Sequence, residues 1–182
     1  WGEQTPLLAD GFALASGEPL RWQEGILSNL ARQQNLLRTL NGLTAVTGET
    51  RWQSAADNWI GHGLRVLQNP DSDLLYWGGH SAWDLGADGP LQGNHELKCA
   101  FPHYEGLFRV DAAATARFID AFWHAHIWDW SSLLFNRHGE YADWDRSQTW
   151  REGEFADTWQ LPIIENSALS FINTGSDLIW AA

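Results

Sequence analysis

The amino-acid sequence predicts an all-α domain in which antiparallel helical hairpins are joined by long irregular loops. Three observations predict this class. Apolar residues recur at helical spacing in several segments. Two of these segments are separated by only a short glycine-containing turn, which favours antiparallel packing. No segment shows convincing β alternation. With 182 residues, the chain can form one domain with a sizeable core, residues 1–182.

The first two predicted helices form a hairpin. Ser28 is a plausible N-cap for a helix that runs to Thr47, and Gly48 suits its C-terminal stop. The apolar face of this helix comprises Leu36, Leu37, Leu40 and Leu43. A second helix is expected over residues 50–68. Its apolar stripe comprises Trp52, Ala56, Trp59, Gly63, Val66 and Leu67. The turn-forming segment 69–73 ends this hairpin.

A second helix pair is expected further along the chain. Proline suits a first helical turn, so a short helix is predicted over residues 102–110. Asp111 can cap a longer helix that ends near Trp128. Its broad face comprises Phe118, Ile119, Phe122, Trp123 and His126. Residues 74–98 and 131–162 read as long irregular loops, and a last helix begins near residue 165.

Stacked helical hairpins that close into a ring form an (α/α) toroid whose long loops gather at one end. This chain supplies about two and a half helix pairs, and it contains no methionine. We therefore expect it to be part of a larger six-hairpin-like toroid.

The net charge of −12 argues against a nucleic-acid partner, because such binding depends on neutralising phosphates. No apolar run approaches the length that spans a bilayer. The acidity is uneven: residues 95–138 carry four basic and five acidic side chains, a net of −1, together with five of the seven histidines. This middle region could therefore receive an anionic group.

Three isolated residues are given structural roles. Cys99, the only cysteine, is read as a small buried hydrophobe. His124 and His126 lie about 200° apart around a helix, so they are not expected to bind one metal ion. His124 follows Asp120 by one turn and can pair with it. His126 is expected to be a hydrogen-bonded core residue.

The tripeptide Asn136-Arg137-His138 is the first candidate site. Arg137 can hold a carboxylate through two parallel hydrogen bonds, and Asn136 can donate to the same group. His138 can transfer a proton near neutral pH. The competing interpretation is that Arg137 pairs with a nearby acidic side chain and braces the loop.

Two further clusters combine aromatic and polar groups. In the first, His80, Trp83 and Asp84 are expected on one exposed loop that Trp77 precedes, and this mix would suit a carbohydrate; alternatively, buried tryptophans stiffen that loop. The second cluster can handle protons or anions. Its members are His95, Lys98, His103 and Tyr104.

Several long segments resemble pectate-lyase-like proteins of bacterial polysaccharide utilisation, which are built on the α/α toroid. They include "QQNLLRTLNGLTAVTGETRW", "LLYWGGHSAWDL", "NHELKCAFPHYEGLFRVD" and "FIDAFWHAHIWDWSSLLFNRHGEY". The resemblance covers most of the chain. It implies β-elimination on an acidic polysaccharide or oligosaccharide, and by analogy an extracellular or periplasmic location.

The resemblance also implies roles for the candidate residues. Arg137 and Asn136 match a clamp on the uronate carboxylate, or Arg137 is itself the base that removes the C5 proton. His138, His95 and Tyr104 are the other proton-transfer candidates. The residues expected to bind substrate are Trp77, His80, Trp83, Asn136 and Lys98.

Related lyases use either Ca²⁺ or polar side chains to neutralise the carboxylate, so a Ca²⁺ ion held by Asp84 or Glu96 is one possibility. Three other functions stay open. A sugar isomerase or epimerase could use the same scaffold. A glycoside hydrolase would need two paired carboxylates. A non-catalytic glycan-binding module would need only the tryptophans.

Overall fold

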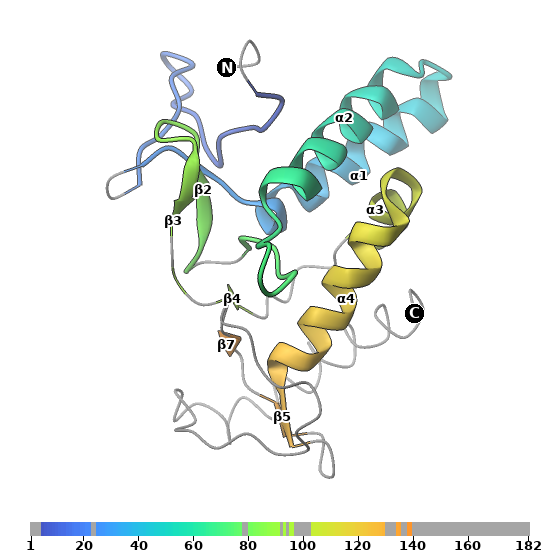
Figure 1. Ribbon diagram of the computed structural model, residues 1–182. Coiled ribbons are helices and arrows are strands. Elements are labelled where there is room, and N and C mark those ends of the chain that lie inside the picture. The colour runs from blue at the N-terminus through green and yellow to red at the C-terminus, as the bar shows by residue number, and fades with distance from the viewer. Residues whose placement is uncertain are drawn as a thin grey trace.

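The computed structural model describes residues 5–22, 25–77, 80–91, 93, 95–96, 103–129, 134–135 and 138–139. Its four helices are α1 (Leu30–Thr47), α2 (Arg51–Val66), α3 (Tyr104–Val110) and α4 (Ala112–His126). The part of the chain that the structure describes is therefore mostly helical, as the sequence predicts. Helices α1 and α2 run side by side as a hairpin, and α3 and α4 follow one another beneath it (Figure 1).

The caps of α1 explain where this helix begins and ends. Asn29, not Ser28, is its N-cap, and the Asn29 side chain accepts a hydrogen bond of 2.9 Å from the Ala31 amide. Ser28 cannot take this place because it belongs to a strand that pairs with Trp83. At the other end Gly48 has φ 73°, the left-handed conformation that glycine adopts without strain.

The buried face of α1 differs from the predicted leucine face. Of the four predicted leucines, Leu37 is buried, whereas Leu36 and Leu43 are more than a third exposed. The core face instead follows Leu30, Gln34 and Leu37, at the i, i+4, i+7 spacing of one helical stripe. Leu36 lies about 100° around the axis from Leu37 and so points away from this stripe.

The faces of α2 and α4 are largely as predicted. In α4, Phe118, Phe122 and His126 are buried. In α2 the predicted Ala56, Trp59 and Gly63 are buried, but the core face also takes in Ile60 and Leu64, while Trp52 and Val66 are only partly buried. Asp111 also caps α4 as expected, because its carboxylate accepts a hydrogen bond of 2.9 Å from the Ala114 amide. The side chain of Trp123 and the helix expected near residue 165 lie outside the described residues.

Short strands occur mostly in the stretches predicted to be irregular, so the all-α class holds only in its coarser form. One of them, at residues 127–129, takes the place of the last turn of the helix predicted to end near Trp128. One antiparallel sheet has the order β1 (Leu27–Ser28), β2 (Ala82–Asp84), β3 (Gly89–Leu91). A second ladder joins β4 (His95–Glu96) to β7 (His138–Gly139), and a third joins β5 (Ile127–Asp129) to β6 (Leu134–Phe135). Strands of two or three residues are too short to show an alternating pattern.

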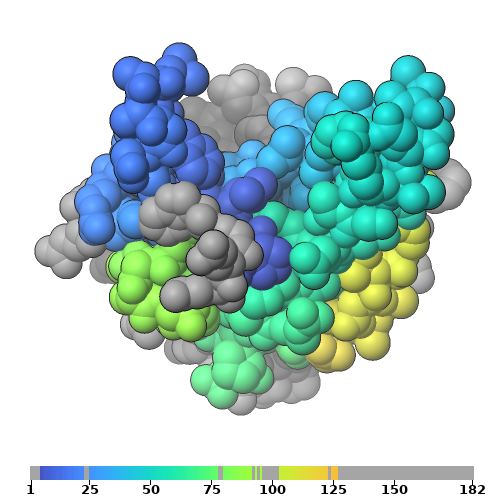
Figure 2. Space-filling model, turned by 90° about the horizontal axis from the view of Figure 1, so that it is seen from above, coloured from blue at the N-terminus to red at the C-terminus, as the bar shows by residue number. Residues whose placement is uncertain are grey.

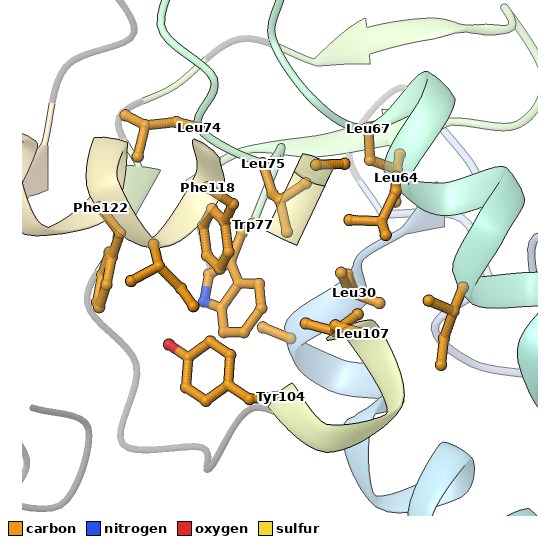
Figure 3. Close-up of a cluster of buried hydrophobic side chains, with 14 of the residues drawn as sticks. Leu30, Leu64, Leu67, Leu74, Leu75, Trp77, Tyr104, Leu107, Phe118 and Phe122 are labelled. Carbon is orange, nitrogen blue, oxygen red and sulfur yellow. The ribbon is translucent and has the colours of Figure 1, made fainter. Parts of the chain in front are cut away.

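The hydrophobic core lies where the helices meet the segment that follows α2. Figure 3 shows Leu30 and Leu107 at one side of this core and Phe118 and Phe122 at the other, with Trp77 between them. Burial of such large side chains is the main stabilising contribution. None of the helices in the part of the chain described here is long and apolar enough to cross a membrane.

The N-terminal segment packs on the start of α1. Seen from above, it stands on one side of the molecule, with the α1–α2 hairpin on the other (Figure 2). Asp10 anchors the segment: its side chain, only 3% exposed, accepts a hydrogen bond of 2.9 Å from the Asn29 amide and lies 3.4 Å from Arg32. Burial raises the pKa of Asp10 to about 6, although Arg32 and the hydrogen bonds from Asn29 and Gln33 oppose this rise.

This raised pKa predicts a dependence of stability on pH. The folded protein binds the Asp10 proton more tightly than the unfolded chain, whose aspartate pKa is about 3.9. The stability contributed by the protonated group is therefore complete below about pH 4 and is lost as the pH rises through 6. In the Asp10→Asn variant this loss should vanish. Between pH 4 and 7, the free energy of unfolding of the variant should therefore rise by about 2–3 kcal/mol relative to that of the wild type. Urea unfolding of both proteins at several pH values measures this difference, and parallel pH profiles would contradict it.

Candidate active site

The ladder between β4 and β7 brings two of the predicted site clusters together. Its register pairs His95 with Gly139 and Glu96 with His138. Helix α4 also contacts β7. Segments that are more than forty residues apart in the sequence are therefore neighbours here, beside the lower turns of α4 (Figure 1). Asn136 and Arg137 lie outside the described residues, but they directly precede β7 in the chain.

His95 is the most enclosed polar residue at this place. It is fully buried, and aromatic rings surround it on several sides. Trp77 stacks on its imidazole with ring centroids 6.3 Å apart, while Phe122 meets it edge-on at 5.5 Å and Phe118 lies at 6.1 Å. This aromatic enclosure fixes the position of the His95 ring, because it packs against both the segment after α2 and one face of α4.

A hydrogen bond links His95 to the end of α4. The Nδ1 atom of His95 lies 2.8 Å from Nε2 of His126, which is itself only 3% exposed. Burial lowers the pKa of His95 well below its usual value, and a charge on the nearby His126 would lower it further. His95 is therefore neutral at physiological pH. The expectation that His126 is a hydrogen-bonded core residue is confirmed.

Trp77 occupies the core rather than an exposed loop. It is only 3% exposed, and its indole ring lies between Phe118 and Tyr104 (Figure 3). A ring that stacks on a sugar needs an open face, so the placement of Trp77 on an exposed aromatic platform is corrected. Here the alternative interpretation, a loop held in place by a buried tryptophan, describes the observed arrangement.

The other members of that predicted platform are nearer the surface. His80 is exposed, and Trp83 is half-buried in β2 with its Nε1 donating to Asp88 at 3.1 Å. The Asp84 side chain is bound to the protein's own backbone. Its Oδ1 accepts hydrogen bonds from the amides of Ile26 (3.1 Å) and Gly86 (2.8 Å). The carboxylate of Asp84 therefore braces the β2–β3 hairpin through its Oδ1 atom.

The remaining residues of the second predicted cluster are divided between the core and the surface. Tyr104 begins α3 and is 6% exposed, with its ring in the core. His103 is half-buried at the contact between α1 and α3, where its Nε2 lies 2.5 Å from the Asn41 side chain and its amide donates to Gln34. Lys98 and Cys99 lie outside the described residues.

His124 has the structural role that the sequence predicts. Its Nδ1 lies 2.8 Å from the Asp120 carbonyl oxygen and 3.4 Å from the Asp120 carboxylate. Among the described residues, no three His, Cys, Asp or Glu side chains are grouped as metal ligands.

The contact between His95 and His126 is the part of the site that sequence reasoning missed. The helical spacing of Phe118, Phe122 and His126 does place them on one face of α4. Their partner lies 31 residues before His126, on a two-residue strand. No local pattern indicates such a pairing, because it depends on how the loop returns to the helix.

Comparison with known proteins identifies the family to which these features belong. The sequence model of a family described as "Periplasmic pectate lyase" matches residues 5–182. A "Pectate disaccharide-lyase" of Dickeya dadantii (strain 3937) is 36% identical over 193 residues, covering 98% of this chain and 35% of that protein. The chain therefore belongs to the periplasmic pectate lyase family, which confirms the resemblance.

The chain spans about a third of the length of this curated relative. The family's description places its members in the periplasm, one of the two locations expected from the sequence.

Proposed function

We propose that this chain forms part of a polyuronate lyase that cleaves pectate by β-elimination. The β4–β7 ladder is the observation that carries this proposal. It sets His138, which directly follows Arg137, opposite Glu96 and next to His95 in the ladder. Family membership over residues 5–182 and the name of the Dickeya relative support pectate as the substrate class.

The proposed reaction needs three groups around the uronate on the reducing-end side of the broken bond. Arg137 and Asn136 bind the uronate carboxylate and neutralise it, which acidifies the proton on C5. A base, His138 or Arg137 itself, removes this proton. The electron pair left on C5 forms the C4–C5 double bond as the C4–O4 bond breaks, and an acid or water protonates the departing O4. The products are a saturated and an unsaturated oligosaccharide.

His95 and Tyr104 support the site in this proposal and do not contact the polymer. His95 is fully buried and Tyr104 nearly so, whereas a polysaccharide needs an open surface. Of the proposed substrate-binding residues, His80 and Trp83 are the accessible ones among those described, and Lys98 remains a candidate for binding a carboxylate. The neutral His95 adds no charge beside the bound anion.

The net charge of −12 does not prevent an acidic polymer from binding. Charges separated by more than about 8 Å are largely screened at physiological salt concentration, so the local net of −1 over residues 95–138 matters more. Ca²⁺ could add positive charge, with Asp84 or Glu96 as the candidate ligand. Any such ion would help to neutralise the uronate carboxylate.

The helices support a finer proposal for the fold. The α1–α2 hairpin is antiparallel, α3 contacts α2, and α4 contacts α3, as expected for successive hairpins in a ring. We propose that they form one sector of an (α/α) toroid, with the β4–β7 ladder at the end where its loops gather.

The natural full-length protein that carries this sequence provides the test. Incubation with polygalacturonate should release a product that absorbs near-ultraviolet light, because its C4–C5 double bond is conjugated with the carboxyl group. Reactions with EDTA, and with Ca²⁺ added back, determine separately whether a metal ion is required. An isomerase, a hydrolase or a binding module would generate no such absorbance. Its absence under all of these conditions would refute the proposal.

A further inference from the structure

We propose that His126 is a positioning residue of this site. Its hydrogen bond to His95 holds β4 against the end of α4 and so fixes the β4–β7 ladder that carries the proposed lyase residues. This inference rests on the proposed function and extends it to a residue outside the predicted catalytic set.

The need for such a residue follows from the shortness of the ladder. Strands β4 and β7 each contain two residues, and a pair of isolated strands is marginally stable even when it is longer. Other contacts must therefore hold the register. The side chain of His95 supplies them, because it is fully buried and fixed among Trp77, Phe118 and Phe122.

His126 is suited to this task by its place at the end of a rigid element. It is the last residue of α4, and its ring lies 4.8 Å from that of Phe122 one turn earlier, in an edge-on contact. Both rings are buried. The helix thereby presents Nε2 of His126 at a fixed position beside the buried ring of Phe122.

The hydrogen bond between the two rings is directional. A neutral imidazole has one donor and one acceptor nitrogen, so one ring donates and the other accepts across the 2.8 Å contact. Packing alone would tolerate small slides of the His95 ring, whereas this bond selects one position and one tautomer. An apolar residue at position 126 cannot form this hydrogen bond and therefore leaves the position and tautomer of His95 unselected. A glutamine retains a donor and an acceptor at a similar distance from the backbone.

A shift of β4 should affect the chemical step more than substrate binding. Proton removal at C5 depends on sub-ångström placement of the base, and a displacement of about 1 Å can cost about 100-fold in rate. Binding of a polymer is shared among several sugar contacts. The turnover number kcat should therefore fall while KM changes little.

The experiment uses four forms of the natural full-length protein: wild type, His126→Leu, His126→Gln and the matched control His124→Leu. Circular dichroism establishes folding, and release of unsaturated product from polygalacturonate gives kcat and KM. We expect His126→Leu to lower kcat by about 10- to 100-fold with KM within about threefold of wild type. His126→Gln should recover kcat to within about fivefold, and His124→Leu should match the wild type.

Other results overturn the inference. If His126→Leu retains the wild-type kcat, or if a folded His126→Gln is as slow as His126→Leu, the hydrogen bond does not position the site. If His126→Leu fails to fold, the comparison moves to His126→Gln and the shorter His126→Asn. A higher kcat for His126→Gln than for His126→Asn supports the positioning role of His126, and equal kcat values refute it. A wild type that releases no unsaturated product refutes the proposed function itself.

Discussion

Replacing Arg137 by alanine in the natural full-length protein should reduce kcat on polygalacturonate by about 10²- to 10⁴-fold. Arg137 is proposed either to neutralise the uronate carboxylate or to remove the C5 proton. Either loss raises the barrier to forming the carbanion-like transition state. Arg137→Lys should recover little of this rate, because an ammonium group cannot form the two parallel hydrogen bonds of a guanidinium. The rate of near-ultraviolet absorbance increase measures both effects.

Arg117→Ala is the matched control for this prediction. Arg117 lies on α4 with its side chain about half exposed, and it pairs with Asp73 at 3.1 Å. Surface ion pairs of this kind contribute about 1 kcal/mol or less to stability. The control should therefore keep the activity of the wild type. Equal activities of Arg137→Ala and the wild type would show that Arg137 only braces its loop.

Replacing Trp77 by alanine should destabilise the protein by about 3–5 kcal/mol, a large part of the stability of a typical domain. The indole fills the centre of the core between Phe118 and Tyr104 and stacks on His95. Its removal leaves a cavity and exposes the buried imidazole to water. Urea unfolding followed by circular dichroism measures the change in free energy.

The same variant separates the two roles considered for Trp77. If Trp77 were a sugar-binding platform, its replacement would raise KM and leave the free energy of unfolding nearly unchanged. That is the opposite of the result expected here. Trp83→Ala serves as the comparison, since Trp83 is half-buried and hydrogen-bonds to the exposed Asp88. It should cost clearly less stability than Trp77→Ala.

The helices could be predicted because their signals are local. Gly48 ends α1, Asp111 caps α4, and the apolar residues of α2 and α4 recur at helical spacing. The N-cap of α1 was predicted one residue too early. Ser28 and Asn29 are both good caps by residue type, and the choice between them depends on the pairing of Ser28 with Trp83, 55 residues away.

The features that sequence reasoning missed depend on contacts between distant segments. Two-residue strands carry no periodicity, so neither the β4–β7 ladder nor its register could be foreseen. The composition of residues 77–84 fits a sugar platform and a packed loop equally well. The fold decides in favour of packing for Trp77, because Phe118 and Tyr104 enclose it. Likewise, His126 could be expected in the core, but its partner His95 could not.

The most direct test of the central claim is a crystal structure of the natural full-length Arg137→Ala variant with a bound galacturonate oligosaccharide. We expect a sugar carboxylate within hydrogen-bonding distance, about 3 Å, of the Asn136 or His138 side chain, alongside the β4–β7 ladder. An oligosaccharide bound away from residues 136–138, with the ladder buried beneath other parts of the protein, would contradict it.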